Sequence, residues 1–290
     1  MKKIIIIIPI YNDWESLKKL LLEINIVIAE IKNISFDCFI INDFSNIEQP
    51  KIIKPKYLHS LKIFNMQQNR GHARCYAFGI RYVFLNEQFD NIILMDGDGE
   101  DRPIEIKSLV EKINNNEKIS VVAKRVKRSE GFLFKFLYEC HKILTYISTG
   151  KKINFGNYSC LTKKDVELIS NQPSLWSSFS GTLKKNLRNL NQINSVRGKR
   201  YFGPSKMSFI KLLIHSLSII AVFKYSVILR SIFSLIILTF LIPYQAFIAS
   251  CLQILIILFN FIILLISLRE KKDELLKSQE NLLSVNEITH

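Results

Sequence analysis

The chain has 290 residues, of which 48% are hydrophobic, and a formal net charge of +15, so it is long enough for one sizeable globular domain and a further segment. Its lysines and arginines are dispersed rather than interleaved with aromatic residues, so we expect anionic lipid and phosphate-bearing substrates as partners and no nucleic acid. The five cysteines show no CxxC or regular spacing, which predicts reduced, packed thiols.

Apolar runs and amphipathic helical stretches alternate in the first part of the chain. The predicted strands are residues 3–8, 36–41, 61–64, 91–95 and 119–123. Asn12 or Asp13 is predicted to cap the first helix, and further helices are predicted after Gly71 and from Pro103. This alternation predicts an α/β fold with a mostly parallel sheet covered by helices on both faces. No GxGxxG or Walker-type loop occurs, so neither a standard dinucleotide fold nor a P-loop enzyme is supported.

Acidic residues gather at the end of the fourth predicted strand, in the stretch "ILMDGDGEDRP" at residues 93–103. The four acids are Asp96, Asp98, Glu100 and Asp101. Crowded carboxylates repel one another unless a positive group lies among them. The carboxyl ends of strands in an open α/β sheet are also where ligands bind, and Tyr11, Asp43 and Asn69 follow other strands in the same way.

A cluster of acids after a strand is typical of three kinds of site. A calcium loop of the EF-hand type needs Gly at its sixth and Glu at its twelfth position, which here are Asp101 and Lys107. An aspartyl-nucleophile phosphatase is disfavoured because its Asp-x-Asp usually lies near the start of the fold. The remaining interpretation is Mg²⁺ or Mn²⁺ held by Asp98 with help from Asp96 and shared with a substrate diphosphate. A solvated acidic loop is the alternative.

The C-terminal part lacks charge over a long stretch, since residues 231–268 contain no Asp, Glu, Lys or Arg. As one helix this stretch would be about 57 Å long at 1.5 Å per residue, nearly twice the hydrocarbon thickness. Pro243 interrupts it, so we predict two transmembrane helices over 225–242 and 249–268. A helical hairpin in a soluble core is the alternative. Positive residues flank both ends, which predicts that both termini are cytoplasmic.

The predicted organisation has four parts. Residues 1–205 form a cytoplasmic domain, 206–224 an amphipathic helix in the membrane interface, 225–268 the two transmembrane helices, and 269–290 a charged cytoplasmic tail forming a solvated helix. A core-packing helix is the alternative for the amphipathic segment. The N-terminal "MKKIIIIIP" has too short an apolar run for a signal peptide and no cleavage site.

The order of several segments is similar to that of a known enzyme family. The segments "IIPIYND", "IINDFSN", "NRGHARCYAFGI" and "LMDGDGEDRP" follow one another as in inverting family 2 glycosyltransferases with the GT-A fold. "RGKRYFGPSKMSF", the interface helix and the two membrane helices resemble the polyprenyl-phosphate glycosyltransferase branch, which includes dolichyl-phosphate mannose synthases. The resemblance covers nearly the whole chain. It implies a GT-A, Rossmann-like sheet and a catalytic role for residues 1–205.

The resemblance also implies roles for individual residues. Those expected to bind the sugar nucleotide are Pro9, Tyr11, Asp43, Asp96, Arg200, Ser205 and Lys206. Those expected to act in catalysis are Asp96, Asp98, Arg125 and Arg128. Within these sets Asp98, with Asp96, would hold the metal, and the two arginines at 125 and 128 would receive the acceptor's phosphate.

Simpler roles remain open for some of these residues. Arg125 and Arg128 also fit a solvated basic stretch or a lipid-surface patch, and Arg200 and Lys206 an anchor for anionic headgroups. A lone histidine at a helix start, such as His72, is expected to be structural or solvent-exposed.

The chain departs from the family pattern at three positions. Asn42 stands where many relatives have aspartate, Phe44 replaces the usual glycine, and Asn157 lies where lipid-phosphate relatives often carry aspartate. These departures put a carboxylate base at that last position in doubt and leave the nucleotide and the sugar open. Taken alone, Tyr11 would be a core-edge aromatic and Asp43 a helix cap or turn residue.

The expected function is transfer of a sugar from a UDP- or GDP-sugar to a polyprenyl (undecaprenyl or dolichyl) phosphate, at the cytoplasmic face of the inner (plasma) membrane, for cell-surface glycan assembly. A phosphate monoester is largely dianionic at neutral pH, so this acceptor needs positioning more than deprotonation. One rival uses a hydroxyl of a lipid-linked oligosaccharide as acceptor and needs a general base. A second rival is an inactive, membrane-tethered scaffold. The resemblance also implies a homo-oligomer of unspecified number.

Overall fold

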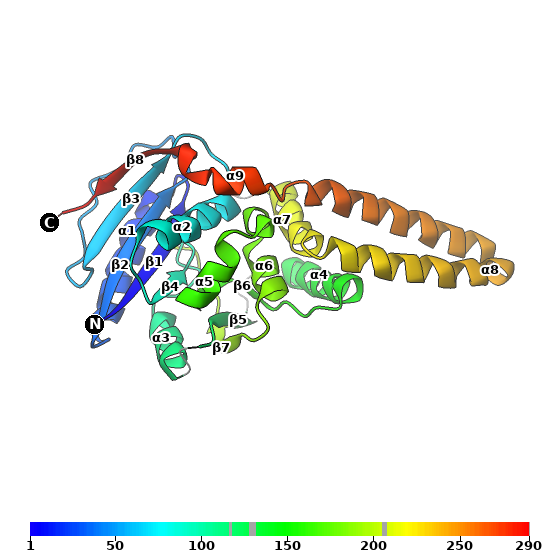
Figure 1. The fold of residues 1–290 in the computed structure, drawn as a ribbon, viewed down its shortest axis with the longest axis horizontal. Coiled ribbons are helices and arrows are strands. Elements are labelled where there is room, and N and C mark those ends of the chain that lie inside the picture. Colours follow the sequence, from blue (N-terminus) through cyan, green and yellow to red (C-terminus); the bar gives the residue numbers. More distant parts are fainter. Residues whose placement is uncertain (116–117, 128–131, 205–207, 290) are drawn as a thin grey trace.

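The computed structural model describes residues 1–115, 118–127, 132–204 and 208–289. An α/β domain carries a long helical hairpin that projects from one end (Figure 1). Three residues assigned to the site from the sequence, Arg128, Ser205 and Lys206, lie outside the described residues.

The described strands form one mixed sheet in the order β7-β5-β6-β4-β1-β2-β3-β8. The strands are β1 (Lys2–Ile10), β2 (Ile34–Asn42), β3 (Ser60–Met66), β4 (Asn91–Leu94), β5 (Val121–Lys127), β6 (Phe155–Thr162), β7 (Asn191–Val196) and β8 (Leu282–Glu287). The central strands β4, β1, β2 and β3 are parallel, and so are β5 and β7. Antiparallel pairing occurs where β6 meets β4 and β5 and where β8 meets β3. The predicted α/β class is confirmed, although β5 extends four residues beyond the predicted 119–123 strand.

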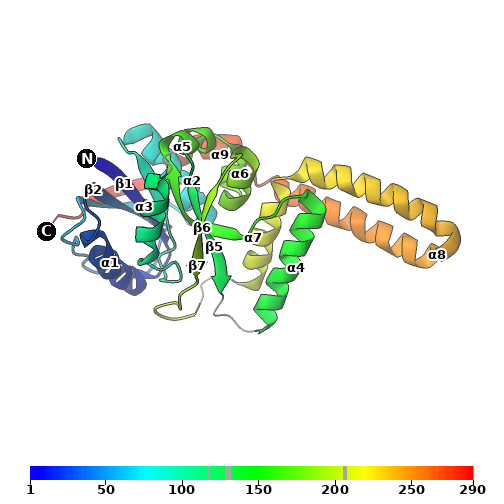
Figure 2. The ribbon, with the colours of Figure 1, turned by 90° about the horizontal axis from the view of Figure 1, so that it is seen from below.

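Helices cover both faces of this sheet (Figure 2). The helices are α1 (Trp14–Ala29), α2 (His72–Asn86), α3 (Glu105–Asn115), α4 (Phe132–Thr149), α5 (Lys163–Ser170), η1 (Pro173–Trp176), α6 (Phe179–Asn186), α7 (Phe209–Ala221), α8 (Lys224–Ser267), α9 (Lys272–Leu276) and η2 (Ser278–Asn281). Residues of α1 and α3 belong to one hydrophobic cluster, and residues of α2, α5 and α6 belong to the other.

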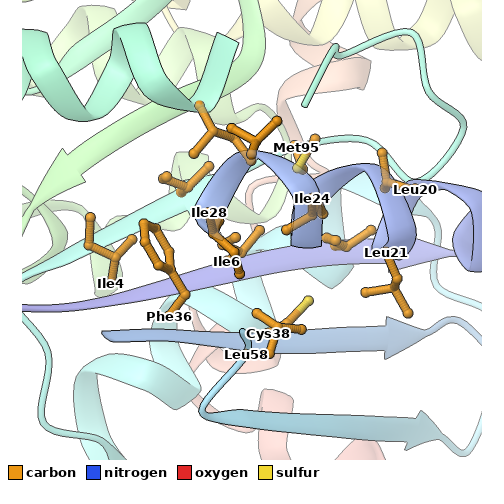
Figure 3. Packing of buried hydrophobic residues seen from close by; sticks show 14 of the residues in the cluster. Ile4, Ile6, Leu20, Leu21, Ile24, Ile28, Phe36, Cys38, Leu58 and Met95 are labelled. Atoms are coloured by element: carbon orange, nitrogen blue, oxygen red, sulfur yellow. The ribbon is translucent and has the colours of Figure 1, made fainter. Parts of the chain in front are cut away.

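The first strand explains why there are two clusters. Its isoleucines, residues 4–8, are all fully buried. Because successive side chains of a strand point to opposite faces, Ile4 and Ile6 pack against α1, whereas Ile5 and Ile7 pack toward α2. Figure 3 shows Ile4 and Ile6 facing Ile24 and Ile28 of α1. A β-branched run buried on both faces is typical of a central parallel strand.

The uncharged stretch lies in α8, which consists of two helices joined at Gln245, a residue with non-helical backbone angles (φ −146°, ψ 60°) just after Pro243. Its two arms lie side by side (Figures 1 and 2), and Gln253 Nε2 donates to Thr239 Oγ1 across them at 3.1 Å. The element is long and apolar enough to cross a membrane, and only 11% of its most apolar stretch is buried. The alternative of a hairpin in a soluble core is therefore wrong, because such a hairpin would bury its apolar side chains.

The segment expected at the membrane interface forms α7, which begins at the N-cap Ser208. Its C-terminal end is buried, and it packs against α8, α4 and α6. Its N-terminal half exposes Phe209, Ile210 and Leu213. Core packing therefore accounts for only one end of α7.

The expectation that residues 269–290 form a separate solvated helix is wrong. After α9 and η2 the chain forms β8, which pairs antiparallel with β3, for example Phe64 with Val285. Asn65 Nδ2 also donates to Ser284 Oγ at 3.1 Å. The physical reason is that β3 would otherwise end the sheet with unpaired backbone groups. The sequence did not predict this short strand, because its residues belong to a charged tail and its partner strand is more than 200 residues away.

Candidate active site

Polar side chains gather at the carboxyl ends of the central parallel strands, as the sequence predicted. Tyr11 follows β1 and is exposed, whereas Asp43 follows β2 and is buried. Asp96 lies two residues beyond β4 and opens the acidic loop, residues 96–102. Because the three strands are parallel neighbours, these residues share one edge of the sheet. Pro9 is buried within β1, and its carbonyl oxygen would lie 3.1 Å from a Cβ at Gly97.

Asp96 is held by hydrogen-bond donors from α2 and β6. Tyr76 Oη donates to its Oδ1 at 2.8 Å, His72 Nε2 lies 3.0 Å from the same oxygen, and Asn157 Nδ2 lies 3.5 Å away. Burial opposes ionisation, but His72 and Arg125 together with these hydrogen bonds hold the pKa of Asp96 below its usual range. Asp96 is therefore ionised at neutral pH. His72 is a direct partner of a site carboxylate, which its position at a helix start did not reveal.

Asp101 supports the loop from beneath rather than facing solvent. Its Oδ2 accepts a hydrogen bond from the backbone N–H of Asp96 at 3.0 Å, and only 4% of the residue is exposed. Arg125 Nη2 lies 4.0 Å from its other oxygen. Burial and the neighbouring charge of Asp96 raise the pKa of Asp101 to about 8. One acid of the cluster is thus neutral at pH 7, which reduces the repulsion among the others.

Asp98 is paired with Arg200, from the segment that the sequence expected near the diphosphate. Arg200 Nη1 lies 2.8 Å from Asp98 Oδ2, and its Nη2 pairs with Asp13 at the start of α1. Burial, followed by the charges of Asp96 and Glu100, raises the pKa of Asp98 to about 6. The charge of Arg200 acts in the opposite direction and favours the ionised carboxylate. Asp13 was predicted only as a helix cap, because its pairing depends on a residue 187 positions away.

Residues 197–202, the covering segment, lie directly over the acidic loop. Tyr201 N donates to the Asp98 carbonyl at 3.0 Å, Gly198 N donates to the Glu100 carbonyl at 2.8 Å, and Arg197 pairs with Glu100. Gly99 has φ +87°, and a Cβ there would lie 2.3 Å from the Tyr201 ring. Glycine is therefore required both by the backbone and by the close approach of this ring.

Asp43, predicted to contact the nucleotide base, is engaged by the backbone. Its two carboxylate oxygens accept from Arg70 N and Gly71 N, each at 2.9 Å. Burial raises the pKa of Asp43, although these two hydrogen bonds act in the opposite direction. This geometry is that of the turn residue given above as the alternative, and it fixes the loop that precedes α2.

The structure shows the surroundings of two departures from the family pattern, and it does not explain the phenylalanine at position 44. Asn42 donates to Asn65 Oδ1 at 2.9 Å and accepts from Ser45 N at 3.1 Å, so it uses both ends of its amide. Phe44 has φ +59°, a left-handed conformation in which glycine is free of strain.

Arg125 faces the acidic loop rather than a solvated surface, with 17% of its side chain exposed. A Cβ on the neighbouring Gly156 of β6 would lie 2.8 Å from its Nη2, so glycine makes room for the guanidinium group. The solvated basic stretch is therefore wrong for Arg125. On the side of α7, burial and the nearby charge of His72 lower the pKa of His215 to about 4. A neutral imidazole from the predicted interface helix thus approaches the site.

The residues present fit a metal ion that is completed by a substrate. Within the described part of the chain, no group of three or more His, Cys, Asp or Glu side chains forms a cage for a metal. Mg²⁺ typically takes one or two carboxylates and fills its shell with water and phosphate oxygens. Asp98 offers one such carboxylate. Its Oδ1 accepts from Glu100 N at 3.0 Å and its Oδ2 lies 2.8 Å from Arg200 Nη1, so a bound metal ion would take the place of Arg200. Asp96 has one carboxylate oxygen already occupied by donors.

Sequence comparison identifies relatives with a related chemistry. A model of glycosyl transferase family 2 matches residues 5–189. An undecaprenyl-phosphate 4-deoxy-4-formamido-L-arabinose transferase of Salmonella choleraesuis is 25% identical over 220 residues, which cover 73% of this chain and 65% of that protein. The transferase of the same name from Salmonella paratyphi B matches equally. The chain thus spans 65% of the length of these curated relatives.

Structural comparison concerns the fold. Glucosyl-3-phosphoglycerate synthase from Mycobacterium tuberculosis, crystallised with Mn²⁺, UDP-glucose and phosphoglyceric acid, superposes with a TM-score of 0.53 at 13% identity, covering 78% of this chain and 80% of that one. A complex of the same enzyme with Mn²⁺, UDP and glucosyl-3-phosphoglycerate gives 0.51. The predicted GT-A arrangement is thereby confirmed. Because the matching family model covers more than half of the sequence, including the acidic loop, the chain belongs to glycosyl transferase family 2.

Proposed function

We propose that this chain transfers a sugar, with inversion, from a UDP- or GDP-sugar to a polyprenyl phosphate at the cytoplasmic face of a membrane. The observation that carries the proposal is that two carboxylates of the acidic loop lie in different electrostatic surroundings. Asp96 is ionised and surrounded by donors, whereas Asp98 has a raised pKa and a cationic partner. Such a site suits a diphosphate bound through a divalent cation.

The residues divide into donor-binding and acceptor-binding groups. Asp98 would hold Mg²⁺ or Mn²⁺, which when bound neutralises charge on the leaving diphosphate. Asp96 would orient the sugar or ribose, and Pro9, Tyr11 and Asp43 would line the nucleotide pocket. Arg200 would exchange its present carboxylate partners for diphosphate oxygens, because a guanidinium group binds both kinds of oxyanion in a bidentate manner. Ser205 and Lys206 belong to the same proposed group.

Three of the four loop acids are poorly suited to act as a general base, and the fourth, Asp98, is assigned here to the metal, which favours a phosphate acceptor over a hydroxyl. Asp96 has a lowered pKa, Asp101 is buried and neutral at pH 7, and Glu100 is paired with Arg197. A phosphate dianion needs no base, since it is already ionised. Arg125 and Arg128 would hold two of its oxygens and leave the third to attack the sugar C1.

Membrane insertion of α8 would place this site at the bilayer surface. Each arm is about 30 Å long at 1.5 Å per residue, which matches the hydrocarbon thickness. Because β8 returns to pair with β3, both ends of α8 must lie on the same side of the membrane. We therefore propose two crossings, with the catalytic domain and both termini cytoplasmic at the inner (plasma) membrane, and α7 in the interface.

A donor screen tests the proposal. The full chain in nanodiscs is incubated with labelled UDP- and GDP-sugars, Mg²⁺ or Mn²⁺, and undecaprenyl phosphate, the acceptor named for the Salmonella relatives. The expected product is a lipid-soluble sugar phosphate whose formation depends on added undecaprenyl phosphate. Product that forms regardless of that lipid would favour a hydroxyl acceptor. No binding of any donor by calorimetry would favour the inactive scaffold.

The metal assignment is tested with Asp98→Ala. We expect loss of transfer and of donor-dependent Mn²⁺ binding in a chain that still folds, because the repulsion relieved in the loop opposes the loss of the Arg200 pairing. The matched control is Asp90→Asn, which changes an acid at the opposite end of β4 that accepts from Lys3 N. Normal turnover of the Asp98→Ala variant would refute the assignment.

A further inference from the structure

A second cluster of cationic side chains lies outside the active site. It surrounds a cavity of about 460 Å³ lined by Gln68, Arg70, Arg74, Trp176, Arg269 and Glu274. These residues come from the loop before α2 and its first turn, from η1, and from the chain after α8 through α9, elements that meet in the structure (Figure 1). We call it the arginine pocket.

The pocket and the active site use different sides of the first turns of α2. His72 and Tyr76, four residues apart, reach Asp96 from one side. Arg74 is two residues from each of them, about 200° around the helix. Its guanidinium carbon and that of Arg70 each lie 5.9 Å from the Trp176 ring. The pocket is therefore separate from the acidic loop while sharing the same helix.

Positive charge in the pocket exceeds negative charge. Its three arginines face the single carboxylate of Glu274, which lies 3.8 Å from Arg70 Nη1. That carboxylate is also shared, because it accepts from Trp176 Nε1 at 3.0 Å and from Lys271 Nζ at 2.6 Å. Arg70 has a further partner in Gln68, whose side-chain carbonyl accepts from it in the amide orientation that satisfies both groups.

Two observations show that the described residues compensate the positive charge of this cluster only in part. The Nε atom of Arg269 is buried without a hydrogen-bond partner among the described residues. Burial and the nearby charge of Arg269 lower the pKa of Arg74 to about 10. Several guanidinium groups around one cavity are the usual arrangement for an oxyanion, because their planar N–H donors match phosphate oxygens.

We propose that the arginine pocket binds a phosphate-bearing anion through Arg70, Arg74 and Arg269. Arg269 follows α8 by two residues, so the pocket lies where an inserted α8 would leave the bilayer and where the phosphate of an anionic lipid headgroup is available. A soluble phosphate compound offers the same chemistry. The lipid source rests on the proposed membrane insertion, whereas the anion site itself does not depend on turnover.

The pocket also has a structural connection to the nucleotide side of the active site. Arg70 contributes its side chain to the pocket and its backbone N–H to Asp43, and Gly71 N donates to the same carboxylate. An anion that fixes Arg70 would therefore also fix the loop before α2. Occupation of the pocket is expected to favour donor binding.

Binding is measured on the full chain purified in a neutral detergent. Native mass spectrometry with phosphatidylglycerol and phosphatidylcholine tests the lipid source, and calorimetry with inorganic phosphate tests the soluble one. We expect one specific adduct, with affinity reduced about tenfold or more in Arg269→Gln and Arg74→Gln, because each removes a charge-assisted interaction. Glu274→Gln should strengthen binding severalfold, since it removes the competing carboxylate and keeps an acceptor for Trp176. Lys272→Gln, an exposed neighbour outside the pocket, is the charge-matched control.

The outcomes separate the sources and can refute the site. Phosphatidylglycerol binding with this order of affinities supports a headgroup, and phosphate binding with the same order supports a soluble ligand. Equal affinities in Arg269→Gln, Lys272→Gln and the parent chain would overturn the proposal in favour of diffuse attraction, and so would weaker binding in Glu274→Gln. If Arg74→Gln does not fold, the affinities of Arg269→Gln, Glu274→Gln and Lys272→Gln still show whether the pocket is the binding site. Because no sugar is transferred in these assays, failure here is distinguishable from failure of the glycosyltransferase proposal.

Discussion

The neutral state of Asp101 has a measurable effect on stability. Its pKa is raised in the folded chain, to about 8 from an ordinary value of 3.8. Between those values the folded chain keeps a proton that the unfolded chain has lost, so stability falls as pH rises through this window. The slope has an upper limit of about 1.4 kcal/mol per pH unit. From pH 5 to pH 7 the cost is therefore at most about 2.7 kcal/mol, and we expect on the order of 1–2 kcal/mol once relaxation around the carboxyl is included.

Asp101→Asn tests this reasoning because asparagine keeps an acceptor for Asp96 N but cannot ionise. Relative to the parent chain, the variant should gain about 1–2 kcal/mol between pH 5 and pH 7, which corresponds to a relative rise in melting temperature of roughly 2–8 °C for a domain of this size. Thermal unfolding in detergent at the two pH values measures it. Subtracting the stability difference between variant and parent at pH 5 from that at pH 7 removes any pH-independent effect of the amide beside Arg125.

Asp37→Asn is the matched control, because folding shifts the pKa of Asp37 in the opposite direction from that of Asp101. Burial of Asp37 is outweighed by Lys3 and His59, which hold its pKa below the ordinary value. Its stabilising contribution is present above that value, so the control should be destabilised at both pH 5 and pH 7. The reasoning about Asp101 is refuted if the difference between Asp101→Asn and the parent chain stays constant or moves against the variant as pH rises. That result would mean an ionised Asp101 paired with Arg125.

Two further predictions concern the covering segment and the C-terminal strand. Gly99→Ala should lower the free energy of unfolding by more than the roughly 1–3 kcal/mol expected for a left-handed backbone alone, because its Cβ also meets the Tyr201 ring. The control is Gly71→Ala, where φ is +90° and nothing lies within 4 Å of the added Cβ, so that only backbone strain contributes. Denaturant unfolding measures both variants. An equal loss of unfolding free energy in the two variants would mean that the covering segment moves away from the added Cβ without a measurable loss of stability. Deletion of 282–290 should lower the melting temperature and increase light scattering, because it exposes the edge of β3, whereas deletion of 289–290 alone should not. Indistinguishable melting curves for the two truncations would contradict a structural role of β8.

Much of the fold follows from local sequence patterns. The run of isoleucines in β1 is apolar at every position, so it can only be a strand buried on both faces, and its alternation divides the core into two layers. The stretch without charges predicts the apolar hairpin in the same way, and Pro243 predicts the position of its bend to within two residues. The acidic loop was found because it directly follows a strand, at the sheet edge where parallel strands present their ligands.

Contacts between distant segments decided the rest. The pairing of Arg200 with Asp98 and Asp13, the burial that keeps Asp101 neutral, and the return of β8 to β3 each join residues that are far apart in sequence. The same holds for the arginine pocket, which Arg269 lines together with Arg70, from the loop before α2, and Arg74 of α2. Periodicity and capping report only the few residues that share a turn or a strand. The charge state of a carboxylate instead depends on every group packed around it, and the sequence by itself does not contain that neighbourhood until the chain is folded.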